Sequence, residues 1–282
     1  MKLLVTGGTG FLGRRITAYF EELGWQVLSP SHGSLDITDE KAVFGWFREN
    51  RPDAMIHTAA VSDTGLCQRE PQWSQRINVD GAVHLAKACH YFGAKPVFCS
   101  SDQVYFRSPA PGPHRETDIL NPGNVYGGQK LCAEQQCLAH NGETVCLRLS
   151  WMYSRQDFPN QHGHFLTTLK NAIKDENQTF SLPIYDRRGL TDVQDVVKNL
   201  PKALKLPGGV WNFGSENDKN TYETVKSVLM ELGLDAVNRL QPNRDAFADI
   251  PRDISMELGK LAGAGITFPT SRDALLQALK AI

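Results

Sequence analysis

Short apolar runs alternate with amphipathic stretches through the first 150 residues of the chain. The apolar runs predict strands at residues 2–6, 25–28, 54–58, 97–100 and 144–149. Between them, apolar residues at helical spacing predict helices over 14–23, 38–50, 71–92 and 126–140, the second capped by Thr38. Strands that alternate with helices predict an α/β fold, here a Rossmann-type doubly wound parallel sheet covered on both faces.

The pattern changes after about residue 150, where Gly, Pro, Asn and aromatic residues become frequent. Helices are predicted over 191–206, 222–232 and 271–280, and Pro201 is expected to end or kink the first of them. A short strand is predicted at 210–213. We therefore expect one domain over 1–155, to which part of 188–213 returns, and a smaller C-terminal lobe over 156–282 that supplies the substrate walls.

A glycine-rich turn joins the first predicted strand to the first predicted helix, in the run Thr6-Gly7-Gly8-Thr9-Gly10-Phe11-Leu12-Gly13. Gly7 permits the tight turn, Gly10 lets the backbone approach a pyrophosphate, and Gly13 lets the helix pack closely on the sheet. The amide groups and the dipole at the helix start favour negative charge. Such glycines also occur in ordinary loops, but the flanking strand and helix favour a dinucleotide-binding domain.

Three side chains form a candidate catalytic set. Tyr126 and Lys130 are four residues apart and lie on one face of a predicted helix. An ammonium group near a phenol lowers the phenol pKa, which makes Tyr126 a usable proton donor or acceptor near neutral pH, and Lys130 can also bind ribose hydroxyls. Ser101 follows the strand at 97–100 and can hydrogen-bond the substrate oxygen that Tyr126 protonates. The same spacing occurs on solvated helices, but its place downstream of the glycine turn favours catalysis.

With these motifs, the chain resembles the extended short-chain dehydrogenases/reductases, and most of all the dTDP-4-dehydrorhamnose reductase group. The matching segments are residues 6–13, 35–39, 51–53, 56–60, 78–82, 100–105, 121–122, the pair Tyr126 and Lys130, and 147–153. The resemblance covers the first 155 residues well and is weaker beyond them, which leaves the substrate-binding lobe less defined.

The resemblance implies roles for individual residues. Tyr126 is the implied proton donor, Lys130 its partner and a cofactor ligand, and Ser101 stands where the family commonly has Thr. Further implied cofactor contacts are Phe11 and Leu12 at the pyrophosphate, Asp36 and Ile37 beside the adenine, and Ala59, Ala60, Val61 and Cys99 along the dinucleotide groove. The implied contacts to the sugar are Asp102 and Trp151.

The second strand ends in Ser29-Pro30-Ser31-His32, without the acid that would bind the ribose 2′-hydroxyl of NAD. We therefore expect NADP, assisted by Arg14, Arg15 or His32, and leave NAD open. Gln103 follows Asp102 where dehydratases carry a glutamate, so dehydration is disfavoured. The expected function is an NAD(P)H-dependent reductase of a nucleotide-linked 4-keto sugar. A nucleotide-sugar epimerase and a non-catalytic, dinucleotide-binding regulatory subunit are the alternatives.

Composition narrows these expectations. The 282 residues carry a formal net charge of −1, which disfavours nucleic acid and anionic membranes as partners. The six cysteines form no CxxC pair, so we expect free, buried thiols and no metal site. Because no secretory signal or membrane span is visible, we expect a cytoplasmic protein. The identity of the sugar and the base, the reaction direction, and the oligomeric state, a homodimer included, stay open.

Overall fold

The structure is a computed structural model that describes residues 1–155 and 165–280. It contains two compact units. Unit 1 comprises residues 1–108, 120–149 and 197–212, and unit 2 comprises 109–119, 150–196 and 213–282. Residues 156–164 and 281–282, at the two ends of the predicted C-terminal lobe, lie outside the described residues.

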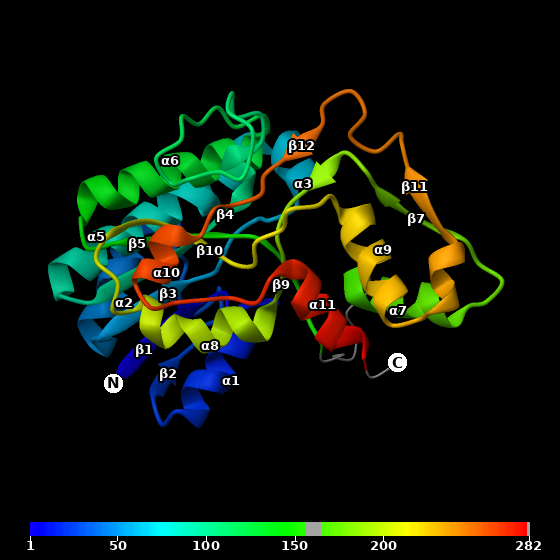
Figure 1. The fold of residues 1–282 in the computed structure, drawn as a ribbon. Helices are drawn as coiled ribbons and strands as arrows, with labels where there is room; N and C mark the ends of the chain where they lie inside the picture. Colours follow the sequence, from blue (N-terminus) through cyan, green and yellow to red (C-terminus); the bar gives the residue numbers. More distant parts are fainter. Residues whose placement is uncertain (156–164, 281–282) are drawn as a thin grey trace. The chain divides into compact units, whose positions relative to one another are not determined.

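Unit 1 is built on a six-stranded sheet in the order β10-β5-β4-β3-β1-β2 (Figure 1). Its strands are β1 (Lys2–Thr6), β2 (Gln26–Leu28), β3 (Ala54–His57), β4 (Lys95–Ser101), β5 (Val145–Leu149) and β10 (Gly209–Phe213). Neighbours from β2 to β5 pair in parallel. The chain leaves β1 toward β2 and returns on its other side as β3, so the sheet is doubly wound and the predicted fold class is confirmed.

Helices cover both faces of this sheet. They are α1 (Gly13–Glu22), α2 (Glu40–Asn50), α3 (Thr64–Arg69), α4 (Pro71–Gln75), the π-helical turn η1 (Arg76–Asp80), α5 (Gly81–Phe92), the 3-10 turn η2 (Asp102–Tyr105), α6 (Val125–His140) and α8 (Val193–Ala203). Figure 1 shows α2, α5 and α6 over one face and α1 over the other. Leu4 and Met55 pack on α2 and α5, and Phe98 and Cys146 pack on α5 and α6.

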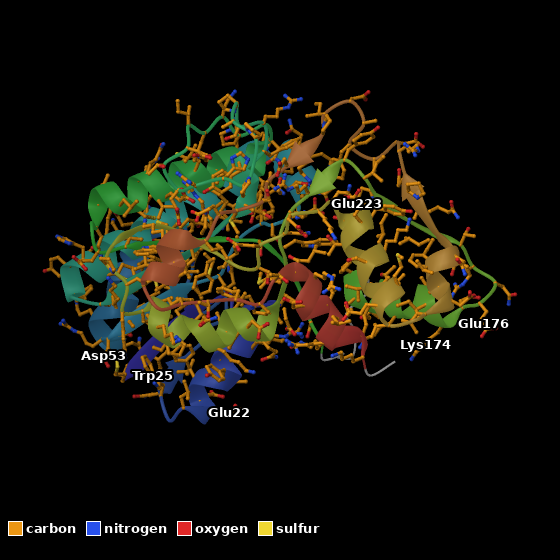
Figure 2. All side chains as sticks on the ribbon, in the orientation of Figure 1. Glu22, Trp25, Asp53, Lys174, Glu176 and Glu223 are labelled. Atoms are coloured by element: carbon orange, nitrogen blue, oxygen red, sulfur yellow. The ribbon has the colours of Figure 1, made fainter. Side chains whose placement is uncertain are left out.

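The parallel strands begin at one edge of the sheet, the amino edge, and end at the opposite one, the carboxyl edge, and the two carry different side chains. At the amino edge, the Asp53 carboxylate accepts a hydrogen bond from the backbone N–H of Lys2 at 2.7 Å (Figure 2). Nearby, Trp25 packs edge to face on Phe20 of α1 with the ring centroids 4.9 Å apart. These are packing contacts, whereas the candidate catalytic residue Ser101 lies at the opposite, carboxyl end of β4.

Three local predictions differ from the structure. The helix expected over 71–92 is interrupted by η1, which changes the phase of the side chains and directs Asn78 toward the loop after β3. Asp39, and not Thr38, caps α2, because Asp39 Oδ1 accepts the N–H groups of Lys41 and Ala42. Pro201 does not end α8, which continues to Ala203.

In the residues that the structure describes, unit 2 has three short pairs of parallel strands, and it has its own core. The pairs are β6 (Trp151–Tyr153) with β9 (Leu190–Asp192), β7 (Phe180–Pro183) with β11 (Leu240–Asn243), and β8 (Asp186–Arg187) with β12 (Arg252–Asp253). Its helices are α7 (Phe165–Lys174), α9 (Thr221–Glu231), the 3-10 turn η3 (Asp235–Asn238), α10 (Gly259–Gly263) and α11 (Ser271–Leu279). Leu169, Val228 and Leu275 are among the residues of its core.

All six cysteines are free thiols, as predicted, and five of them are buried; Cys132 is half-buried. Within residues 1–155 and 165–280, no helix combines the length and the apolar character needed to cross a bilayer.

Candidate active site

The glycine-rich turn connects β1 to α1 at the carboxyl edge of the sheet. Gly7 has a φ of +71°, a left-handed conformation that favours glycine. A Cβ on Gly13 would stand 2.1 Å from the carbonyl oxygen of Gly7, so α1 begins directly against the turn. No side chain caps the start of α1 at Leu12. The turn therefore forms a close backbone cradle at a helix N-terminus, which fits a pyrophosphate.

The loop after β3 lies beside this turn, because β3 pairs with β1 and Thr6 is in register with His57. The side chain of Asn78 holds the loop at Val61, accepting from its N–H at 2.8 Å and donating to its carbonyl at 3.0 Å. Asn78 also donates to Gln129 on α6 at 2.8 Å. Ala59 and Ala60, which precede Val61, are half-buried. The strand order reverses at β1, because β2 lies on one side of it and β3 on the other. Ligands of open α/β sheets bind in the crevice at this reversal, beside the carboxyl ends of the strands.

The predicted catalytic hydroxyl groups are brought together at the end of β4. Ser101 ends the strand, and Asp102 begins η2 directly after it. The Ser101 hydroxyl hydrogen-bonds the phenol of Tyr126 and donates to Asp102 Oδ1 at 3.3 Å. Both Ser101 and Asp102 are buried. β1, β3 and β4 are parallel, so these groups and the glycine turn lie at the same edge of the sheet, where the strands end. Two strand spacings, about 10 Å, separate β4 from β1.

The second half of the set comes from α6. Asn124 caps this helix by accepting the N–H of Gly127 at 2.7 Å, which fixes the first turn where Tyr126 lies. Lys130, one turn later, is buried. Its Nζ donates to the carbonyl oxygen of Cys99 on β4 at 2.9 Å and lies 5.7 Å from the centroid of the Tyr126 ring. The spacing prediction that Tyr126 and Lys130 share a helix face is therefore confirmed.

The pKa prediction for Tyr126 is wrong. Burial raises the pKa of the Tyr126 phenol above its ordinary value, the Ser101 hydroxyl lowers it only in part, and the Asp102 carboxylate raises it. Lys130 donates to a backbone carbonyl instead of the phenol, and burial lowers its own pKa to about 8. Tyr126 therefore carries its proton at neutral pH, which suits a proton donor better than a base.

His57, at the end of β3, is a buried histidine that sequence reasoning did not single out. Its Nδ1 lies 2.6 Å from Thr6 Oγ1, and its ring stacks on Phe98 at 5.7 Å between centroids. Its Nε2 is buried and has no hydrogen-bond partner in the part of the chain that the structure describes. Burial, with a contribution from the charge of Lys130, lowers the pKa of His57 to about 3. The imidazole is therefore neutral in the folded protein.

His57 predicts how stability depends on pH. Its folded pKa lies below the ordinary value of 6.5, so the unfolded chain binds the extra proton first as the pH falls. Stability is present above pH 6.5 and is lost below it. Between pH 6.5 and pH 4 the wild type should lose about 3 kcal/mol more unfolding free energy than His57→Gln. Urea titrations across this range measure both slopes, with exposed His90→Gln as the control. Equal slopes for the wild type and His57→Gln would contradict the prediction.

Two predicted adenine contacts follow β2. Asp36 Oδ1 accepts both the N–H and the hydroxyl of Thr38, and the second of these bonds is the main reason that the pKa of Asp36 is lowered. Ile37 is buried and packs in the core with α2 and α5. Their contact with an adenine stays a prediction. Ser29, just after β2, lies against the glycine turn, since a Cβ on Gly8 would meet its hydroxyl.

Trp151, the remaining predicted substrate contact, belongs to unit 2, and its contact with a sugar stays a prediction. It lines a pocket of about 190 Å³ in that unit. The Arg188 guanidinium lies 5.1 Å above the Trp151 ring, and Arg252 lies 4.0 Å above the ring of Phe247, which also lines the pocket. Aromatic rings beside guanidinium groups suit a planar base and its phosphates.

Sequence reasoning missed several buried polar residues of the site. They include Asn78, Glu134 and Arg148. Asn78 and Arg148 belong to the segments that match the family, but no role was predicted for them, and Glu134 lies outside those segments. One signal was present, because Glu134 lies four residues after Lys130 on the same helix face. The partners of these residues are distant in sequence and could not be read from spacing.

Fold and site together define a Rossmann-type α/β protein with a tyrosine and lysine pair at the carboxyl edge of its sheet. The chain belongs to the RmlD substrate binding domain family, whose model matches residues 1–282. Methionine adenosyltransferase 2 subunit beta of Xenopus laevis is 32% identical over 281 residues, 94% of this chain and 83% of that protein.

Two solved structures have the same fold. A dTDP-4-dehydrorhamnose reductase from Clostridium acetobutylicum has a TM-score of 0.82 at 26% identity, over 100% of this chain and 99% of that one. The Bacillus anthracis dTDP-4-dehydrorhamnose reductase, in complex with NADP, has a TM-score of 0.84 at 22% identity over the same shares. The predicted resemblance to the dTDP-4-dehydrorhamnose reductase group is confirmed by the family match and these neighbours.

Proposed function

We propose that this protein is an NADPH-dependent reductase of a 4-keto sugar linked to a nucleoside diphosphate. The observation that carries the proposal is the meeting of Ser101, Tyr126 and Lys130 at the end of β4, on the same sheet edge as the glycine turn. A protonated phenol, a hydroxyl that orients it and a buried ammonium are the groups that carbonyl reduction needs.

The residues of the chain have distinct roles in this reaction. A bound nicotinamide dinucleotide supplies a hydride for the ketone carbon. Tyr126 donates its phenolic proton to the ketone oxygen, and burial keeps that proton in place until the transfer. Ser101 orients the same oxygen through its hydroxyl. Lys130, fixed by the carbonyl of Cys99, is placed to bind ribose hydroxyls.

The glycine turn fits a dinucleotide, because it is closed so tightly that a Cβ at Gly7 would lie 2.7 Å from the backbone nitrogen of Ala59 and a Cβ at Gly13 would lie 2.1 Å from the carbonyl oxygen of Gly7. The end of β2 favours NADPH: Ser29 lies against the turn, and residues 29–32 contain no carboxylate to repel a 2′-phosphate. The NADP complex of the Bacillus anthracis reductase supports this choice.

We expect NADPH to bind at least about tenfold more tightly than NADH, since a 2′-phosphate adds charge-assisted contacts. Ser29→Asp should remove this preference by placing a carboxylate against the turn. Ser34→Asp, at an exposed position of the following loop, is the control. Quenching of intrinsic fluorescence on titration with each dinucleotide measures the affinities. Tighter binding of NADH by the wild type would contradict the assignment.

The pocket of unit 2 supports a nucleotide-linked substrate. Trp151 offers a stacking surface for a base, and Arg188 offers a guanidinium group for a diphosphate. Arg252 lines the same pocket with its Nε donating to the Asp186 carboxylate at 2.7 Å. Assaying 4-keto-6-deoxy sugars carried on different nucleoside diphosphates, with NADPH, tests the proposal. Oxidation of NADPH with one of them supports it. Interconversion of sugar epimers without net oxidation would favour the epimerase instead.

A second candidate function rests on the Xenopus laevis relative, whose name describes a subunit of another enzyme. In that case the chain would bind dinucleotide and a partner enzyme without turnover of a sugar. Ser101, Tyr126 and Lys130 are all present, which favours the reductase. Size-exclusion chromatography of the chain with a methionine adenosyltransferase tests the second candidate: a stoichiometric complex, together with no turnover of any keto sugar, would favour it over the reductase.

A further inference from the structure

A series of buried polar groups connects α6 to the strands on either side of Ser101. Glu134, one turn after Lys130, has 1% of its surface exposed. Its Oε1 accepts a hydrogen bond from Ser100 Oγ at 2.5 Å. Arg148 of β5 donates to both carboxylate oxygens, with Nη2 2.8 Å from Oε2 and Nε 3.1 Å from Oε1. One carboxylate thus joins α6 to both β4 and β5.

The same network continues past Arg148. Its Nη1 donates to the hydroxyl of Tyr105 at 2.8 Å, and this hydroxyl donates to Asn212 Oδ1 on β10 at 2.7 Å. Tyr105 and Asn212 are fully buried, and the Arg148 guanidinium also lies 5.0 Å from the centroid of the Tyr105 ring. All of these residues belong to unit 1.

Residues of this network lie on both sides of Ser101, the candidate catalytic hydroxyl, in the sequence. Ser100 directly precedes Ser101 and is in register with Arg148. Tyr105 ends η2, the turn that begins directly after Ser101. On α6, Glu134 lies on the helix face that carries Tyr126 and Lys130. The network therefore fixes the backbone on both sides of Ser101 to the helix that holds its partner.

Stability alone does not account for such an arrangement. Burying an ion pair costs desolvation that the attraction barely offsets, and apolar residues of similar volume often stabilise a fold as well. A buried network does impose one geometry on the elements it joins. Resting on the proposed reductase function, we propose that Glu134, Arg148 and Tyr105 are positioning residues that set the Ser101 hydroxyl against the Tyr126 phenol.

Tyr105→Phe is the sharpest test, because it removes one hydroxyl from the network and leaves the ring in place. The Tyr105 hydroxyl contacts Arg148 and Asn212, and not Tyr126 or Lys130. A change in turnover would therefore come from a shift in the position of the catalytic groups. We expect kcat to fall about tenfold or more, since small misplacements of reacting groups lower rates strongly. The KM for the sugar and the affinity for NADPH should change by less than about threefold. Glu134→Gln should lower kcat further, up to about 100-fold.

Asn141→Ala is the matched control. Asn141 is equally buried, caps the opposite end of α6 and donates to the carbonyl of Ala86 at 3.4 Å. Its loss should lower stability and leave kcat within about twofold of the wild type. An unchanged kcat in Tyr105→Phe, or an equal fall in Asn141→Ala, would overturn the positioning role.

Hydrogen exchange separates a failure of this inference from a failure of the proposed function. In Tyr105→Phe, amides of η2 and the first turns of α6 should exchange faster than in the wild type, whereas Asn141→Ala should affect the end of α6. If the wild type turns over no keto sugar, the reductase proposal fails while this exchange pattern still decides whether the network orders the site. Unchanged exchange in η2 and α6 would overturn the inference independently.

Discussion

Tyr126→Phe should lower turnover by about 10²- to 10⁴-fold, the range typical for loss of a general acid. The phenol hydrogen-bonds Ser101 and retains its proton because burial raises its pKa. Phenylalanine preserves the ring and its packing but removes the only proton that this position can donate. Dinucleotide affinity should stay within about twofold, since the glycine turn and Lys130 are unchanged.

The comparison needs a tyrosine that is remote from the chemistry. Tyr91 on α5 is 73% exposed, so Tyr91→Phe should retain wild-type turnover and stability. Steady-state rates with saturating NADPH, together with dinucleotide titrations, distinguish lost chemistry from lost binding. If Tyr126→Phe kept the wild-type rate, the proton would have to come from another group and the proposed mechanism would be wrong.

Gly13→Ala should strongly weaken dinucleotide binding and destabilise the fold. Its Cβ would lie 2.1 Å from the carbonyl oxygen of Gly7 and 2.9 Å from Gly8 Cα, both backbone atoms that cannot turn aside. Either the turn opens or α1 moves away from the sheet. Overpacking of this kind costs about 1–3 kcal/mol or more. We expect the affinity for NADPH to fall at least about 100-fold, because the cradle itself is deformed.

Gly45→Ala is the matched control, because the same change of glycine to alanine should here stabilise the fold instead of destabilising it. Gly45 lies inside α2, and a Cβ there would meet no atom within 4 Å. Alanine should therefore stabilise the protein by up to about 1 kcal/mol through helix propensity and leave binding unchanged. Thermal unfolding and NADPH titration of both variants make the comparison. Wild-type affinity in Gly13→Ala would contradict the assignment of this turn.

Features that depend on short sequence spacing were predicted well. The glycine turn follows from a short motif between a strand and a helix, the Tyr126 and Lys130 pair from helical spacing, and the hydroxyl of Ser101 from its position after a predicted strand. The alternation of strands and helices likewise predicted the doubly wound sheet. These signals are local, so the sequence displays them without reference to the rest of the fold.

Features that depend on tertiary placement were missed or predicted wrongly. The pKa of Tyr126 is governed by burial of the phenol, which a helical spacing cannot report. The π-helical turn η1 exists where Asn78 reaches Val61 and Gln129, partners 17 and 51 residues away. Glu134 and Arg148 look like ordinary charged positions in the sequence, and only the packing of α6 against β5 brings them together.

The most direct test of the proposed reductase is the transfer of label from NADPH deuterated at both C4 positions to a dTDP-linked 4-keto-6-deoxy sugar. We expect one deuterium at the former ketone carbon of the product, formed in equal amount with NADP⁺, and about 10²- to 10⁴-fold slower product formation with Tyr126→Phe. Tight binding of NADPH with no labelled product from any keto sugar would contradict it, and would favour the role of a dinucleotide-binding subunit.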